Sequence, residues 1–201
     1  MHPNPAFRTD EDLLDAAAAI GFAHIFVGSP APMVVHAPVT RHGGTLRFHI
    51  ARANRIARHL DGADIMVSVQ GVQGYVSPGW YAPDRDPVPT WNYCTIEVEG
   101  RCARIDEAAL IEQLDAIAAT HEPRVNPAAP WTRDKMSEAG FRALLRGIHG
   151  FQVTPTATRA TAKLSQNRSA ADRDGAIAGL RAAGFAALAD TMAAPPPSLA
   201  R

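Results

Sequence analysis

The strongest constraint on the fold comes from short runs in which apolar and polar residues alternate. Residues 46–50, 65–69 and 96–102 alternate in this way, and a two-residue period is that of a strand with one buried face. Glycine and proline lie between these runs, which is typical of the turns that join antiparallel strands. Most of the helical periodicity comes later in the chain. The sequence therefore predicts a mainly β chain of the α+β class, a small β-barrel with packed helices.

Local patterns predict the individual elements. Strands are expected at residues 22–27, 33–39, 45–50, 65–70, 95–102 and 151–158. Tight hairpins are expected at 41–44 and 71–75, and a proline-rich loop at 121–133. Helices are expected from a cap at Thr9 to a stop at Gly21, after the junction 51–54 through about Leu60, and from about 106 to 118. Further helices are expected from 141 to 148 and from about 170 to 183 after a cap at Ser169, with a shorter helix reaching Met192.

Length and composition fit one domain. The chain has 201 residues, of which 46% are hydrophobic, enough to bury a sizeable core. We expect a single domain over residues 1–192. Residues 193–201 are rich in proline and alanine, and we expect a disordered tail there.

Charge and hydropathy exclude several classes of protein. Lys plus Arg and Asp plus Glu both number 20, so the chain lacks the basic excess that usually accompanies nucleic-acid binding. It has no apolar run of about 18 residues and no secretory leader, so we expect neither a membrane span nor secretion. On a single strand, Cys94 and Cys102 would be about 26 Å apart, too far for a disulfide. They are expected to be buried thiols of a cytoplasmic protein.

Large aromatic residues concentrate in one stretch. All three Tyr and two of the three Trp lie between Tyr75 and Tyr93, among many glycines and prolines. Such a cluster can form the wall of a pocket for a flat ligand. It can equally plug a barrel end or form an interface, where Trp and Tyr are also favoured. Composition alone leaves both interpretations open.

A basic junction follows the strand at 45–50. Arg52, Ala53 and Asn54 lie where a helix is expected to begin, and backbone N–H groups with an arginine can hold a phosphate there. Arginine and asparagine are common at helix starts, so this signal is weak by itself. Arg47 and His49 are expected on the outer face of the same strand, which would favour a second copy of the chain covering them.

Three further runs are more specific when taken together. They are Ser77-Pro78-Gly79-Trp80-Tyr81, Val88-Pro89-Thr90-Trp91-Asn92-Tyr93 and Lys163-Leu164-Ser165-Gln166-Asn167-Arg168. Supporting segments are 36–38, 44–54, 121–122 and 130–131. In this order they resemble the PaiB-type FMN-binding family, described as negative transcriptional regulators, over about residues 7 to 190. The chain departs from the family pattern at Gly79, at Ala37 and in a shortened loop between Val39 and Gly44.

The resemblance implies an FMN-binding split β-barrel with a helical C-terminal segment, related to flavin reductases and pyridoxamine-phosphate oxidase. Such proteins are usually homodimers with FMN at the subunit interface. The flavin site is then expected to involve twelve residues: Arg52, Ala53, Asn54, Gln70, Ser77, Trp80, Trp91, Asn92, Tyr93, Lys163, Gln166 and Asn167.

Residue chemistry suggests roles within this set. Arg52 and Asn54 suit the phosphate, and the large aromatics suit the ring. The amides of Asn92, Gln166 and Asn167 can meet the polar edge of the ring. Lys163 or Arg168 could stabilise negative charge there.

Three functions remain open at this stage, the last of which is a structural dimer that has lost its ligand. The first is an FMN-binding transcriptional regulator, for which direct DNA contact is not favoured by the neutral charge. The second is an FMN-dependent oxidoreductase or flavin reductase that uses NAD(P)H. The sequence contains no motif for a nicotinamide site, and it does not determine whether the protein is an enzyme.

Overall fold

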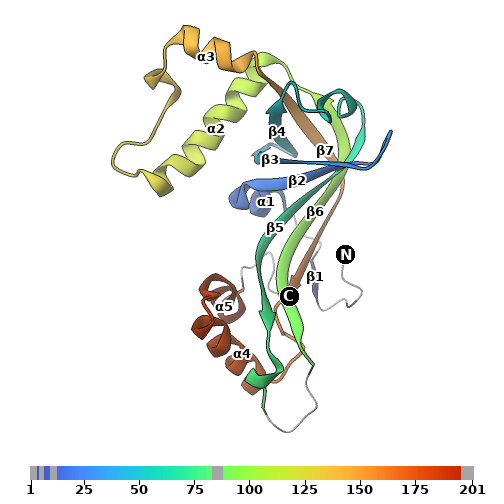
Figure 1. Cartoon of the computed structure of the whole chain (residues 1–201), viewed down its shortest axis with the longest axis vertical. Helices are drawn as coiled ribbons and strands as arrows, with labels where there is room; N and C mark the ends of the chain where they lie inside the picture. The colour runs from blue at the N-terminus through green and yellow to red at the C-terminus, as the bar shows by residue number, and fades with distance from the viewer. Residues whose placement is uncertain (1–3, 5–6, 10–12, 83–87, 196–201) are drawn as a thin grey trace. The chain divides into compact units, whose positions relative to one another are not determined.

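The computed structural model describes residues 4, 7–9, 13–82 and 88–195, and Figure 1 traces its elements. Within these residues the strands are β1 (Arg8–Thr9), β2 (Phe22–Val27), β3 (Met33–His42), β4 (Thr45–Ala51), β5 (Asp64–Val76), β6 (Thr90–Arg104) and β7 (Ile148–Lys163). The helices are α1 (Leu14–Ile20), α2 (Glu107–Val125), α3 (Glu138–Leu145), α4 (Ala170–Ala182) and α5 (Ala186–Ala193).

The strands form one sheet in the order β1-β7-β4-β3-β2-β5-β6, and a further pairing of β7 with β6 closes it. β2, β3 and β4 follow one another as antiparallel neighbours, and β4 pairs with β7 in the register Phe48↔Phe151. The six longer strands thus make an antiparallel barrel, which confirms the predicted α+β fold. Side chains such as Ile25, Leu46 and Val153 are fully buried in its core.

The chain divides into two compact units. One contains residues 1–13, 70–97 and 158–201, and the other contains residues 14–69 and 98–157. In the first, α4 and α5 pack on each other. The second contains α1, α2 and α3, with α1 and α2 packed on β3.

β5, β6 and β7 are longer than the sequence indicated, and the predicted hairpin at 71–75 is wrong. β5 continues from Asp64 to Val76 without a turn. Gly74 lies within the strand, where a Cβ atom would come 2.9 Å from the Leu188 side chain. Because Gly74 has no side chain, α5 can approach the strand closely at this point. The residue does not mark a turn.

Two helix boundaries also differ from expectation. Thr9 belongs to β1, which pairs with β7, so it does not cap α1; residues 10–12 lie outside the described residues. α2 extends to Val125 through the stretch predicted as a loop, with Pro123 in its last turn. In place of the short helix predicted between the junction 51–54 and Leu60 there is only a 3₁₀ turn at Ala57–His59. The end of the last helix is as predicted within about one residue, and residues 196–201 lie outside the described part.

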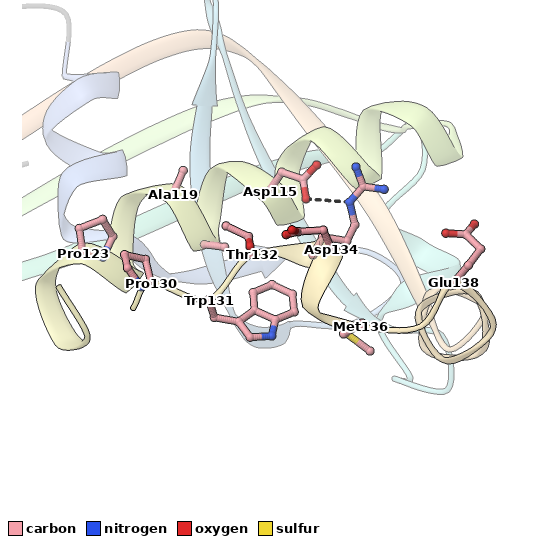
Figure 2. A pocket seen from close by; sticks show the side chains of 11 residues that line it. Asp115, Ala119, Pro123, Pro130, Trp131, Thr132, Asp134, Met136 and Glu138 are labelled. Carbon is pink, nitrogen blue, oxygen red and sulfur yellow. Dashed lines mark hydrogen bonds and ion pairs between the residues drawn. The ribbon is translucent and has the colours of Figure 1, made fainter. Parts of the chain in front are cut away.

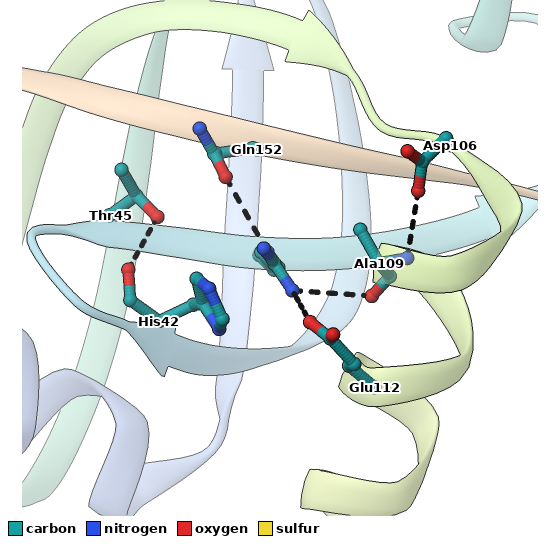
Figure 3. A network of polar contacts seen from close by, with 7 residues as sticks. His42, Thr45, Asp106, Ala109, Glu112 and Gln152 are labelled. Atoms are coloured by element: carbon teal, nitrogen blue, oxygen red, sulfur yellow. Dashed lines mark hydrogen bonds and ion pairs between the residues drawn. The ribbon is translucent and has the colours of Figure 1, made fainter.

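Arg47 anchors α2 to the barrel. Its side chain on β4 is only 7% exposed. It donates to Glu112 Oε2 at 2.9 Å and to the Ala109 carbonyl of α2 at 3.3 Å, and its Nε donates to Gln152 Oε1 of β7 at 3.4 Å (Figure 3). His49 lies beside the buried Gln113 of α2, and burial lowers the pKa of its imidazole. Because α2 covers both residues, they give no reason to expect a second copy of the chain there.

The two cysteines are free and buried, as predicted. Burial raises the pKa of Cys94 to about 11 and, together with Asp61, that of Cys102 to about 12. Neither thiol is activated as a nucleophile.

Candidate functional site

A polar cavity of about 280 Å³ lies beside the turn that follows β7. It gathers Asn92, Lys163 and Asn167 from the predicted set, together with Arg168. The remaining lining residues are Phe7, Thr90 and Ser165. The sequence therefore anticipated four of the seven lining residues from two runs about 70 positions apart.

Asn92 is the most deeply buried polar residue of this cavity. It is 0% exposed, and its amide nitrogen donates to Ser165 Oγ at 2.8 Å and contacts Met192 Sδ at 3.4 Å. Its Oδ1 is buried and has no hydrogen-bond partner among the described residues. A buried acceptor without a donor costs about 1–3 kcal/mol. A ligand that brings an N–H group to this side of the cavity would supply the missing donor.

Two cations give the cavity its charge. Lys163 Nζ donates to Thr90 Oγ1, and burial, with a contribution from Arg168, lowers the pKa of its ammonium group. The Arg168 guanidinium lies 4.8 Å from the centre of the Tyr81 ring. Since no carboxylate lines the described cavity, a group that carries or develops negative charge is favoured there.

Gln166 belongs to the turn that shapes this cavity. Its Oε1 accepts from the Leu164 N–H at 2.7 Å and its Nε2 donates to the Ala162 carbonyl at 2.6 Å. Ser165 adopts a positive φ of 63°, which is uncommon for a residue other than glycine. The side chain of Gln166 thus closes the turn on itself, whereas Asn167 lines the cavity.

Trp80 is partly buried and packs against the core cluster that includes residues of α4. A Cβ atom at Gly179 would overlap its indole ring, and one at Gly175 would overlap its carbonyl oxygen. The two glycines are four positions apart on α4, and this spacing puts them on one helix face. Ser77 caps the 3₁₀ turn Pro78–Trp80 by accepting from the Gly79 N–H at 3.2 Å. Both residues thus have structural contacts within this unit, and their role at the flavin stays a prediction.

Trp91 is more exposed to solvent than Trp80. Its indole is 48% exposed, donates to Gln73 Oε1 at 2.8 Å and meets Tyr75 edge to face. Tyr93 is half-buried on the same strand, and Gln70 is exposed on β5. Of the predicted aromatic wall, Trp91 is the member that presents a large apolar surface.

Arg52 lies in the other compact unit, where the ends of three strands meet. With Arg104 at the end of β6 and His149 at the start of β7, it lines a cavity of about 140 Å³. Arg104 donates to His149 Nδ1 at 2.7 Å. Burial, Arg104 and Arg52, in that order, lower the pKa of His149. Two carboxylates also line this cavity, but Asp106 accepts from the Ala109 N–H and Glu107 pairs with Arg142. The two guanidinium groups and the imidazole are therefore the groups that can meet a small anion.

The neighbouring residues shape the junction. The Arg52 amide donates to the Gly147 carbonyl at 2.8 Å. Asn54 Oδ1 accepts from the Ile56 N–H at 3.1 Å and so closes its own turn. Ala53 is exposed between them.

Sequence reasoning missed Thr90, Ser165, Arg104 and His149. Ser165 lies inside a run that was singled out, and its contact with Asn92 depends on strand pairing. Arg104 and His149 come together only because their strand ends meet at one edge. The described residues contain no group of three or more metal-ligating side chains and no helix suited to crossing a membrane.

Comparison with protein families gives a match over most of the chain. The family model described as "Putative FMN-binding domain" matches residues 1–157. A curated relative, "Protease synthase and sporulation protein PAI 2" of Bacillus subtilis, is 34% identical over 109 residues, which cover 54% of this chain and 51% of that protein. An uncharacterised protein of Emericella nidulans, AN0679, is 26% identical over 184 residues, or 75% of this chain and 73% of that protein.

Solved structures share the fold. The flavocytochrome Anf3 of Azotobacter vinelandii superposes with a TM-score of 0.58 at 17% identity, covering 81% of this chain and 72% of Anf3. An FAD and heme binding protein of Mycobacterium smegmatis gives 0.57 at 18% identity, covering 84% and 79%. At these identities the similarity establishes the barrel fold only.

Proposed function

This chain belongs to the FMN-binding domain family that matches residues 1–157, and on that premise we propose that it is an FMN-binding regulatory protein of the PaiB type. Its cofactor is FMN. The observation that carries the proposal is the cavity in which Asn92, Lys163 and Asn167 converge, because residues predicted for a flavin from separate runs meet in one place.

The residues present fit the polar edge of a flavin. The isoalloxazine edge carries carbonyl oxygens and one N–H group, so it needs both donors and an acceptor. Asn92 Oδ1 offers a buried acceptor without a partner among the described residues, and Asn167 can donate and accept. Lys163 and Arg168 hold positive charge beside it and would stabilise electron density on the ring. When bound, FMN supplies one- or two-electron redox chemistry.

The cluster of Arg52, Arg104 and His149 fits the phosphate. A guanidinium pairs with phosphate oxygens through charge-assisted hydrogen bonds, and the cluster has two. The imidazole of His149 accepts from Arg104 at Nδ1, which leaves its Nε2–H as a donor. We assign these three side chains to phosphate binding.

The regulatory role and the homodimer with FMN at the subunit interface are supported by the family resemblance. PAI 2, whose name links it to protease synthesis and sporulation, is matched over about half its length. The neutral net charge disfavours direct DNA contact. We propose that regulation depends on the flavin-bound state of the protein.

Titration of the purified chain with FMN, followed by NAD(P)H, tests the function. The proposal expects a saturable shift of the flavin absorbance and no rapid bleaching by NAD(P)H. Turnover of NAD(P)H would favour an oxidoreductase instead, and failure to bind FMN would overturn the site. Light scattering tests the dimer: a monomer near 21.5 kDa that still binds FMN tightly would contradict it.

A further inference from the structure

A second hollow region lies between α2, the segment 126–137 and α3, within one compact unit. It consists of two adjoining cavities of about 600 and 450 Å³. Both are lined by Ala118, Trp131 and Met136. Figure 2 shows the larger one, with Trp131 and Met136 on the segment that faces α2. None of the residues assigned to the flavin belongs to either cavity.

The smaller cavity, called the inner cavity because the buried Phe141 and Leu145 line it, is mostly apolar. His121 and Glu122 are its polar lining residues. Leu114 and Ile117 of α2 face Phe141, Leu145 and Ile148. Leu114 and Ile148 are only partly buried, although they pack on the cluster formed by Leu110, Phe141 and Leu145. A volume of about 450 Å³ lies in the range of small-molecule pockets.

The outer cavity carries negative charge. Its lining includes the carboxylates of Asp115, Asp134 and Glu138 and one guanidinium, that of Arg133. Arg133 is paired with Asp115 at 3.1 Å (Figure 2). A hydrogen bond from Thr132 is the main cause that lowers the pKa of Asp134, so this carboxylate stays ionised at neutral pH. Glu138 is in turn paired with Arg142 at 2.7 Å, and Arg133 and Lys135 both lie near Asp134. Asp134, which has no ion pair within 4 Å among the described residues, is therefore the lining carboxylate that can attract a cation.

Hydrogen bonds within the segment 126–137 and from α2 fix the conformation of the segment. Glu122 Oε2 accepts from the Trp131 N–H at 2.8 Å, and Lys135 Nζ donates to the Pro130 carbonyl at 2.7 Å. Asn126 Nδ2 donates to the Ala129 carbonyl at 2.7 Å. Because these bonds fix the segment without filling the space beside α2, little ordering remains to be done when a ligand enters.

We propose that this region binds an organic cation with an apolar, ring-bearing body. The body occupies the inner cavity against Leu114 and Phe141. The Trp131 indole, 37% exposed, forms the wall between the two cavities, and its π face attracts a cation. The charge lies in the outer cavity near Asp134. This second site adjoins the cavity of Arg52, Arg104 and His149, because Leu145 and Ile148 line both.

Calorimetric titration of the FMN-saturated full chain with benzyltrimethylammonium tests this, because its charge lies at one end of an apolar ring, and phenylacetate serves as the anion built on the same ring. We expect saturable binding of the cation and at least tenfold weaker binding of the anion. Ala118→Leu should weaken the cation at least tenfold, because Ala118 lines both cavities. Ala143→Leu, on the exposed side of α3, should leave it unchanged.

Two further variants keep the test decisive. Ala119 is exposed and lines only the outer cavity, so Ala119→Leu should fold normally and still weaken the cation. Asp134→Asn should weaken the cation several-fold and not the anion. No cation binding, equal binding of both ions, or no effect of Ala118→Leu and Ala119→Leu would each overturn the proposal. FMN titration of every variant separates these outcomes from failure of the flavin site.

Discussion

Arg47 and Asn92 are both buried polar residues, yet their surroundings differ. The Arg47 guanidinium, in one compact unit, has three acceptors from α2 and β7. Asn92, in the other unit, uses its amide nitrogen within the fold but has a buried oxygen without a partner among the described residues. A buried group whose hydrogen bonds are complete stabilises the scaffold, whereas an incomplete one beside a cavity indicates a ligand. The comparison predicts that changes around Arg47 alter stability and that changes around Asn92 alter binding.

Trp80 extends the scaffold side of this comparison, because α4 packs directly on it. Gly179→Ala would place a methyl group inside the Trp80 ring. We expect the free energy of unfolding to fall by about 1–3 kcal/mol, despite the better helix propensity of alanine. Urea unfolding measures this. Gly44→Ala, where no atom lies within 4 Å of the added methyl group, is the matched control. Equal stability of the two variants would show that Trp80 does not depend on this helix face.

Arg47→Leu tests directly the buried guanidinium that has its hydrogen-bond acceptors within the fold. Loss of its charge-assisted hydrogen bonds should lower the free energy of unfolding by about 1.5–3 kcal/mol. FMN affinity of the folded variant should not change. For comparison, Arg142→Leu removes an exposed pair with Glu138, which should cost at most about 1 kcal/mol. A large loss of FMN affinity in folded Arg47→Leu would contradict the division between scaffold and site.

Gln166 and Asn167 are neighbours that should respond differently. Gln166→Ala removes two hydrogen bonds that close the turn and should lower stability by about 0.5–1.5 kcal/mol. Asn167→Ala should leave stability unchanged and weaken FMN and riboflavin alike. Thermal unfolding and titration with both flavins measure the two effects. If Gln166→Ala alone weakens flavin, its amide contacts the ligand as the family resemblance implies.

The smallest expected effect is on the pH dependence of the free energy of unfolding, measured on the flavin-free protein. Burial and the two arginines hold the pKa of His149 below its ordinary value, and burial does the same for His49. The unfolded chain therefore takes up protons first as the pH falls below about 6.5. The free energy of unfolding should decline from there down to the folded pKa values, and these two groups should not affect it above that range. His49→Gln with His149→Gln should flatten this decline in melting scans; an unchanged decline would assign it to other groups.

Local signals predicted what depends on neighbours along the chain. The strand Phe22–Val27 was predicted at its observed bounds, and Ser169 caps α4 as expected by accepting from the Asp172 N–H. Strand lengths were underestimated because glycine within a strand, such as Gly74, has the same local pattern as a turn. Pro123 has the local pattern of a loop in the same way, although it lies in the last turn of α2.

The site was only partly predictable for a related reason. Trp80 and Trp91 look equivalent in sequence, because the glycines that accommodate Trp80 lie about 100 residues later on α4. Arg104 and His149 carry no motif, and only the meeting of strand ends brings them to Arg52. Asn92 and Lys163 could be placed together from the family resemblance, but the unpaired oxygen of Asn92 is visible only in the packed structure.

The central claim is that phosphate and ring are bound by different side chains, and one comparison tests it most directly. The affinities of FMN and riboflavin are measured for Arg52→Ala and Asn92→Ala by fluorescence titration. Arg52→Ala should weaken FMN by about 1.5–3 kcal/mol and leave riboflavin unchanged, because riboflavin has no phosphate to pair with the guanidinium. Asn92→Ala should weaken both flavins to a similar extent. Equal weakening of the two flavins by Arg52→Ala, or no weakening of either by Asn92→Ala, would contradict the account.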